Sequence, residues 1–157
     1  MCRAIEVLFQ IHQLLPRAAR LGVMAESTYR GRRAAVIENN DLRVTVLKEG
    51  GHVAEILDKP SGVNPLWTPP WPSIEPSTYD PHKHPEYGAG TDARLLAGIM
   101  GHNLCLDVFG GPSDAESAAG ITPHGEGSVV PYEIVETDGA LTMHICGWLR
   151  FNSSGRS

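Results

Sequence analysis

Apolar and polar residues alternate in short runs after Met24. The runs "AAVIEN" (34–39), "LRVTVL" (42–47) and "HVAEIL" (52–57) are rich in β-branched residues, and the turn residues of "NND" and "KEGG" separate them. A period of two places successive side chains on opposite faces of a strand. The pattern predicts a meander of antiparallel strands, each with one buried face.

The second half of the chain alternates less regularly. The apolar run "ARLLAGIM" (93–100) predicts a helix. After it, Leu104, Leu106 and Val108 alternate with other residues, and this alternation predicts a strand from Asn103 to Phe109, with Asp107 on its solvent side.

A capping signal and a turn signal complete the pattern. In "SDAESAAG" (113–120), Ser113 is followed three residues later by Glu116, which is the spacing of a capping box at a helix start. Farther along, "SVVPYEIVE" (128–136) and "ALTMHICGWLRF" (140–151) flank "TDG", which predicts a β-hairpin. Together these elements predict a mainly β fold, an antiparallel β-sandwich with little helix.

A proline-rich segment, residues 58–88, interrupts the strands. It holds eight of the twelve prolines and two of the three tryptophans, Trp67 and Trp71. Flexible linkers seldom carry so many aromatic side chains, and Tyr79 and Tyr87 add two more. Aromatic residues at this density hold a loop against a sheet or present apolar faces to a ligand. We expect an ordered loop.

The first 23 residues have a different pattern. Apolar residues recur there at roughly helical spacing among basic ones, in a stretch too short and interrupted for a membrane span. The segment lacks the continuous apolar core of a signal peptide, and it is poor in serine for an organelle-targeting helix, which stays an alternative. Because "MAESTYRGRR" from Met24 resembles a natural chain start, we expect residues 1–23 to be an extension that packs poorly on a domain spanning 24–157.

Composition narrows the partners and the compartment. The net charge of −5 offers no basic face to neutralise phosphates, which argues against nucleic acid. No stretch predicts a membrane partner. The three cysteines, Cys2, Cys105 and Cys146, are odd in number and lack CxxC spacing. They predict buried or free thiols in a reducing, cytoplasmic compartment.

Three stretches of the chain carry a family resemblance. "VIENNDLRVTVLKEGGHVAEILDKPSGVNPLW", "GHNLCLDVFGGPS" and "HGEGSVVPYEI", in this order, resemble the N-terminal half of aldose 1-epimerase-like proteins of the galactose mutarotase superfamily. The resemblance covers residues 29–143. It implies a large antiparallel β-supersandwich with a cleft for a small sugar, an aldose, whose α and β anomers the enzyme interconverts. Proteins that bind sugars without this activity share the fold.

Mutarotation needs a base that removes the proton of the anomeric hydroxyl and an acid that protonates the ring oxygen. The resemblance implies a histidine acid and a glutamate base, with neither metal nor organic cofactor. In the family an earlier histidine, followed by glycine, hydrogen-bonds the sugar, and His124 of "PHGE" matches it. The acid and the base are expected beyond Ser157. We therefore expect this chain to be an inactive N-terminal fragment of the enzyme.

Five residues are candidates for contact with the sugar. His124 is either the family's binding histidine, with a neighbour Gly125 that permits close backbone approach, or a loop histidine that caps a strand end. Glu126 is either a sugar contact or an exposed loop glutamate, Asn103 a contact or a turn residue, and Arg94 a contact or a solvated side chain. Glycines precede both loops, so we expect His124 to share one face of the sheet with His102 or Asn103. The predicted substrate-binding residues are His124, His102, Asn103, Glu126 and Arg94.

Two other functions stay open. One is a carbohydrate-binding β-sandwich without catalysis. The other is a metal-dependent, cupin-like β protein, because His82 and His84 have HxH spacing and could bind a metal with Asp80 or Glu86. The prolines of "DPHKHPE" oppose a regular strand there, and the cupin order of ligands is absent. The histidines on which this metal-dependent alternative would rest are His82, His84, His102 and His124.

Overall fold

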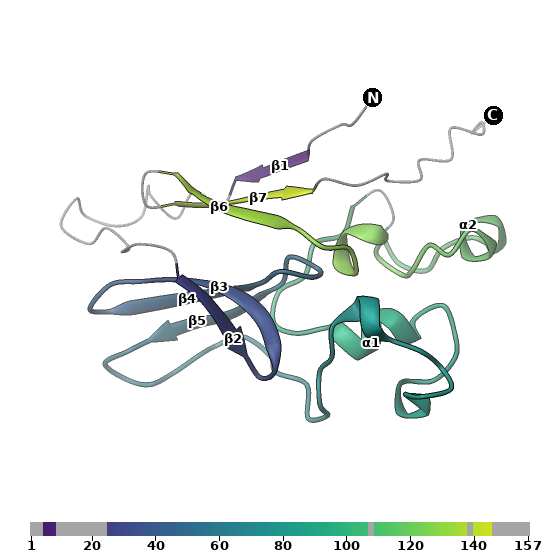
Figure 1. Cartoon of the computed structure of the whole chain (residues 1–157), viewed down its shortest axis with the longest axis horizontal. Helices are drawn as coiled ribbons and strands as arrows, with labels where there is room; N and C mark the ends of the chain where they lie inside the picture. The colour runs from purple at the N-terminus through teal and green to yellow at the C-terminus, as the bar shows by residue number, and fades with distance from the viewer. Residues whose placement is uncertain (1–4, 9–24, 107–108, 138–139, 146–157) are drawn as a thin grey trace.

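The computed structural model describes residues 5–8, 25–106, 109–137 and 140–145 of the 157-residue chain. The described part is mainly β, with an antiparallel four-stranded sheet and few helices (Figure 1). The predicted meander of antiparallel strands is confirmed, since the strands of this sheet pair in chain order. They are β2 (Ala25–Tyr29), β3 (Arg32–Glu38), β4 (Leu42–Leu47) and β5 (Val53–Asp58).

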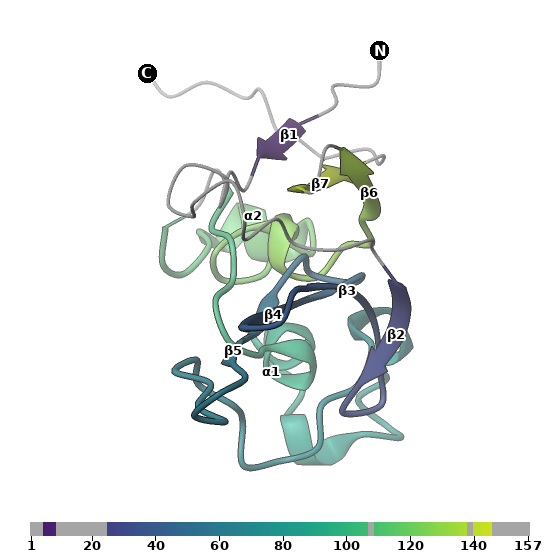
Figure 2. The same cartoon turned by 90° about the vertical axis from the view of Figure 1, so that its left-hand side faces the viewer.

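A second sheet of three strands lies alongside the first (Figures 1 and 2). The predicted hairpin is confirmed, because β6 (Glu133–Thr137) pairs antiparallel with β7 (Ala140–Ile145). Its turn residues 138 and 139 lie outside the described residues. The third strand, β1 (Ile5–Leu8), pairs antiparallel with β7. It falls within the stretch that the sequence predicts as an extension.

Two short α-helices and three 3-10 turns belong to the described part. The predicted helix after the proline-rich segment is confirmed as α1 (Ala93–Gly98). The predicted capping box is confirmed at α2 (Asp114–Ala118), where Ser113 and Glu116 bond each other's backbone N–H groups. No described helix has the length and apolar character needed to cross a membrane. The 3-10 turns are η2 (Pro76–Thr78), η3 (Pro85–Tyr87) and η4 (Glu126–Ser128).

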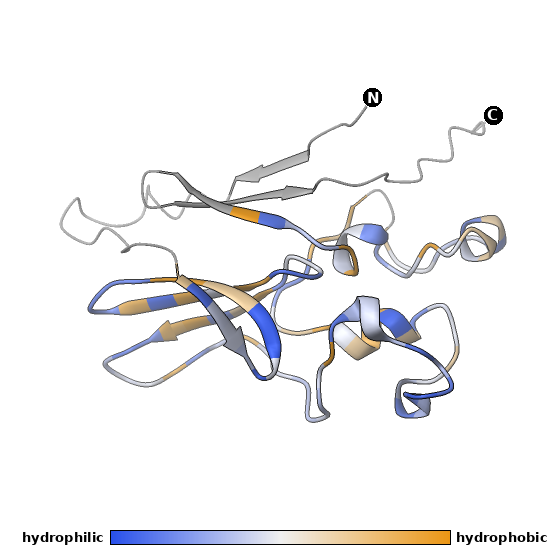
Figure 3. Ribbon diagram, viewed as in Figure 1, coloured by the Kyte–Doolittle hydropathy of each residue, from blue (hydrophilic) through white to orange (hydrophobic). Residues whose placement is uncertain are grey.

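The core lies on both faces of the four-stranded sheet. Ala34 and Ala35 are both fully buried, although neighbouring side chains of a strand point to opposite faces. The sequence prediction of one buried face per strand is therefore wrong for the middle of this sheet. Orange stretches in Figure 3 mark apolar residues on parts of β3, β4 and β5. One cluster contains Ala35, Ile37, Val44, Val46, Val53, Tyr132 and Ile134, and the other contains Ala34, Leu47, Ala54 and Met100.

The strand predicted from Asn103 to Phe109 is wrong for its described residues, which form no strand; Asp107 and Val108 lie outside the described part. Leu104 and Leu106 do pack against the core, which explains their alternation. Their backbone groups, however, bond to a loop instead of a neighbouring strand. The carbonyl of Leu104 accepts from the Ser128 hydroxyl, and the N–H of Leu106 donates to the His124 carbonyl.

The proline-rich segment is ordered, as predicted. The Trp71 indole donates to the carbonyl of Leu96 in α1, and the Tyr87 hydroxyl donates to the Pro72 carbonyl. Trp67 meets Trp71 edge-on with ring centroids 5.7 Å apart. These contacts show that the aromatic residues fix the segment, while Trp67 keeps about half of its surface exposed (49%).

A fully buried arginine ties this segment to the sheet. The Arg32 guanidinium at the start of β3 donates from Nε to Glu75 Oε2 at 3.0 Å. Its other nitrogens donate to the Ser73 hydroxyl and the Gly98 carbonyl, at 3.0 and 2.6 Å, and to the Glu49 carbonyl at 2.8 Å. Burial lowers the pKa of Arg32 and the Glu75 carboxylate opposes that change, so the cation depends on its partner.

A second carboxylate completes this network. Glu49, which is 2% exposed, accepts from Arg33 Nη2 at 2.9 Å and from the backbone and hydroxyl of Ser77, both at 2.8 Å. Glu75 also accepts from the Arg33 backbone N–H at 2.6 Å. We call these residues the Arg32 cluster: Arg32, Arg33, Glu49, Ser73, Glu75 and Ser77. In the described part of the chain, no buried side-chain nitrogen or oxygen lacks a hydrogen-bond partner.

Candidate functional site

Two loop segments that the sequence singled out lie side by side. The first, residues 102–106, starts at the edge of the four-stranded sheet, where His102 and Val53 exchange backbone hydrogen bonds of 2.9 and 3.0 Å. The second, residues 121–128, meets it through the bond from Leu106 N to the His124 carbonyl at 3.1 Å. We call these segments the loop pair. The structure therefore brings His124 next to the stretch that carries His102 and Asn103.

His124 has an unusual backbone conformation. Its φ of 66° lies in the left-handed region, which few residues other than glycine occupy, and Gly125 follows with a φ of 82°. A Cβ atom at Gly125 would lie 1.9 Å from the Leu106 carbonyl oxygen, so only glycine fits. The close approach that the sequence predicted for a ligand is made by the chain's own backbone. Strained backbone of this kind is common at functional sites.

The His124 side chain contacts a thiol. Nδ1 of the imidazole lies 3.3 Å from Sγ of Cys105, which is a free and exposed cysteine. Phe109 meets the imidazole edge-on with ring centroids 6.2 Å apart, and its side chain is 93% exposed. Sequence reasoning missed Cys105 as a site residue, since only its place in "GHNLCLDVFGG" beside a second histidine loop hinted at it.

The other predicted sugar contacts differ in exposure. His102 is exposed, whereas Asn103 and Glu126 are partly buried. Glu126 is the first residue of η4, and its carbonyl accepts from Val129 N at 3.0 Å. The imidazole of His124 and the carboxylate of Glu126 thus belong to one short loop, two residues apart.

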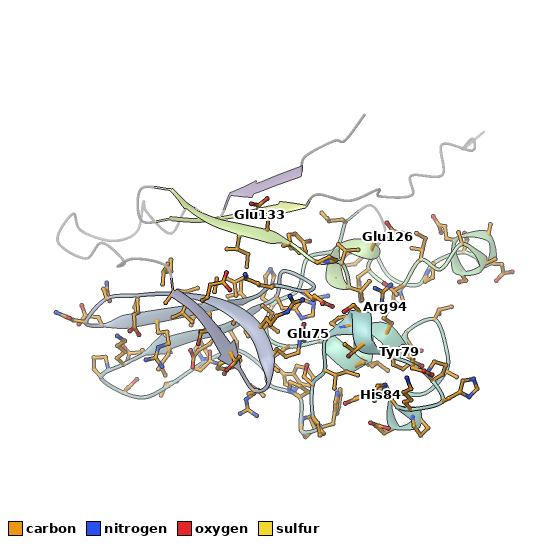
Figure 4. All side chains as sticks on the ribbon, viewed as in Figure 1. Glu75, Tyr79, His84, Arg94, Glu126 and Glu133 are labelled. Atoms are coloured by element: carbon orange, nitrogen blue, oxygen red, sulfur yellow. The ribbon has the colours of Figure 1, made fainter. Side chains whose placement is uncertain are left out.

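Arg94 braces the site from α1. Its Nε donates to the Pro76 carbonyl at 3.1 Å and its Nη2 to the Val129 carbonyl at 3.4 Å. Figure 4 shows Arg94 between the segment that carries Glu75 and the one that carries Glu126. Both of these bonds go to backbone carbonyls, so Arg94 joins the proline-rich segment to the end of η4.

A buried histidine contacts the loop pair from the core side. His52 is fully buried; its Nδ1 accepts from Met100 N at 3.1 Å, and its Nε2 lies 3.0 Å from the Ser128 carbonyl. These partners assign the neutral tautomer with the proton on Nε2. Burial, with a smaller contribution from Arg32, lowers the pKa of His52 to about 4. The imidazole is neutral at neutral pH and acts as a fixed link between α1 and η4.

Tyr132 also contacts the loop pair from the core. Its hydroxyl donates to the Gly127 carbonyl at 2.9 Å, and burial raises its pKa to about 12. The hydroxyl therefore stays protonated and keeps this bond through the neutral range. Together with His52, it holds the backbone of η4 by two side chains from the core.

The HxH pair of the proline-rich segment is arranged differently from a ligand set. His84 Nδ1 accepts from the Asp80 backbone N–H at 3.2 Å, and His82 is exposed. Across the described ranges, no three residues among histidine, cysteine, aspartate and glutamate gather as they would around a metal ion.

The loop pair thus presents an imidazole and a thiol, beside the exposed phenyl ring of Phe109, on a backbone that His52 and Tyr132 hold from the core. Such a surface can donate and accept hydrogen bonds, and its thiol is open to reagents. Comparison with known proteins finds no matching family model, no matching curated protein and no matching solved structure.

Proposed function

We propose that the chain binds an aldose at the loop pair, as part of an aldose 1-epimerase-like protein with a galactose mutarotase-like β-sandwich. The observation that carries the proposal is the hydrogen bond from Leu106 N to the His124 carbonyl. It joins the two segments to which the family resemblance assigns the sugar-contacting residues His124, His102 and Asn103.

The chemistry of the loop pair suits a sugar. Sugar hydroxyls both donate and accept hydrogen bonds, as do neutral imidazole and carboxamide groups. An exposed aromatic ring such as Phe109, beside His124, offers an apolar face for the C–H groups of a pyranose. A site with a few fixed polar groups beside an apolar surface is the usual form of a small-molecule site.

Anomer interconversion itself is proposed for the parent enzyme. It requires an acid and a base on opposite sides of the anomeric carbon, and each contributes about 10²–10⁴-fold to the rate. His124 and Glu126 follow each other so closely in one loop that they cannot straddle a pyranose ring. The role proposed for His124 is to hold the sugar.

Titration calorimetry with glucose and galactose tests the proposal. We expect saturable binding that His124→Gly weakens roughly tenfold, because one hydrogen bond is worth about 1.4 kcal/mol. Glycine keeps the left-handed backbone and removes only the side chain. The matched control is His82→Ala, an exposed histidine in the proline-rich segment, which should bind like the wild-type chain.

Equal affinity of the His124→Gly variant, or no saturable binding, would overturn the proposed site. Polarimetry of freshly dissolved α-glucose adds a second reading, for which we expect no acceleration by the chain. Acceleration that disappears in His124→Gly would make His124 catalytic instead of sugar-holding.

A further inference from the structure

The contact between Cys105 and His124 plays no part in the proposed sugar binding. Sγ and Nδ1 are 3.3 Å apart, within hydrogen-bonding distance for sulfur. The thiol is exposed, so a reagent in solution can reach it. A thiol beside an imidazole is the arrangement in which a histidine removes the proton of an attacking cysteine.

The backbone fixes this pair. The bond from Leu106 N to the His124 carbonyl holds the residue after Cys105 against the loop of His124. A Cβ atom added at Gly125 would lie 1.9 Å from the Leu106 carbonyl oxygen, so the two segments pass close to each other at this point. The edge-on ring of Phe109 contacts the imidazole from another direction. The fold therefore holds the thiol and the imidazole close to each other, through the backbone of both segments and through the ring of Phe109.

We propose that Cys105 is a nucleophilic thiol assisted by His124 as a base, and that it is a site of covalent modification by small carbon electrophiles. In the reaction with a haloacetamide, sulfur forms a bond to the electrophilic carbon and the halide leaves with the electron pair of the carbon–halogen bond. The thiol proton passes to Nδ1 of His124. The inference does not rest on sugar binding.

Other titratable groups of the loop pair must be considered in a pH experiment. Among the described residues, His102 and Glu126 belong to the loop pair, while His52, Arg94 and Tyr132 bond to it or to the residue that follows it; Asp107 lies outside the described part. Tyr132 stays protonated, because its pKa is raised to about 12. These groups are the same in the proteins compared below, so differences between those proteins report on His124.

The test is the rate of alkylation by iodoacetamide, followed by mass spectrometry, in chains whose Cys2 and Cys146 are replaced by serine. At about pH 7, His124→Asn should react at no more than about a tenth of the parent rate, since a positioned base typically contributes 10²-fold or more. Asparagine tolerates the left-handed backbone but is not a base. His82→Asn is the matched control and should react like the parent chain.

A second pH separates a base from a merely structural residue. At about pH 10, hydroxide in solution can take the place of a positioned base, so the rates of the two proteins should converge. A deficit of the same size at both pH values, or equal rates at pH 7, would overturn the proposal. His124→Gly gives the same two readings should His124→Asn fail to fold.

Discussion

The Arg32 cluster and the loop pair both join distant segments of the chain, but they use different groups to do so. Each joins segments far apart in the chain, Arg32 to Glu75 over 43 residues and Cys105 to His124 over 19. The Arg32 cluster does so with a charged group fully removed from solvent and bonded at every nitrogen. The loop pair does so through the backbone bond from Leu106 to His124, and it leaves its thiol and the neighbouring ring of Phe109 exposed.

The difference distinguishes side chains that stabilise the fold from side chains that can contact a ligand. Arg32 and Arg94 donate hydrogen bonds to groups of the chain itself, so they have few donors left for a ligand. A site that is held by its backbone keeps its side chains for other molecules, and such sites often lie on loops placed by a rigid scaffold. If this distinction is correct, removing a side chain should destabilise the first region far more than the second.

The largest effect is expected at Glu75. Glu75→Ala leaves the buried Arg32 cation without its carboxylate and should lower the free energy of unfolding by about 3–5 kcal/mol. Urea denaturation measures the change. Glu38→Ala is the matched control, because Glu38 pairs with Arg43 and Lys59 at the surface, and its loss should leave the denaturation midpoint unchanged within error. Similar midpoints for both variants would show that the Arg32 cluster contributes little.

His52 should make stability depend on pH. Its pKa is about 4 in the folded chain against 6.5 ordinarily, so between these values the unfolded chain binds a proton that the folded chain does not. The free energy of unfolding should therefore rise with pH through this window, and fall by roughly 3 kcal/mol as pH drops from 6.5 to 4. The imidazolium would also lose the Nδ1 acceptor that Met100 N–H uses.

Carboxylates titrate in the same window, so the informative quantity is the difference between wild type and His52→Gln. Denaturation at a series of pH values should show a flatter rise for the variant. Parallel curves for the two proteins would mean that His52 does not contribute to the pH dependence.

The smallest effect compares two glycines of the loop region. Gly120 and Gly125 have φ of 84° and 82°, but a Cβ meets nothing within 4 Å at Gly120 and the Leu106 carbonyl at Gly125. Gly120→Ala should cost about 1 kcal/mol for the left-handed conformation alone. Gly125→Ala should cost about 2 kcal/mol more, because the backbone must move. Equal midpoints in thermal denaturation of the two variants would show that the loop pair is loosely held.

Patterns that are local in the sequence predicted the structure well. The meander from β3 to β5 followed from residues alternating within six or seven positions, and the start of α2 from Ser113 and Glu116, three residues apart. The stretch after His102 was misread because Leu104 and Leu106 alternate as strand residues do. Alternation reports which side chains are buried, and it does not reveal whether the backbone pairs with a strand or with a loop.

The side chains that build the site were harder to predict. Arg32 looks like any surface arginine in "GRRAAV", and its burial depends on Glu75 and Gly98, which are 43 and 66 residues away. The approach of Cys105 to His124 likewise depends on a turn that only Gly125 permits. Contacts of this kind leave no periodic trace, because each residue type is ordinary in its own neighbourhood.

The Arg32 cluster also bears on how the molecule opens. In the proline-rich segment, Ser73 and Glu75 bond to the buried Arg32, and Ser77 bonds to the buried Glu49. Moving any one of them away would leave a buried charge, either Arg32 or Glu49, with fewer partners, which costs free energy. We therefore expect the segment and the start of β3 to open as one cooperative unit, whose amide protons exchange together with solvent.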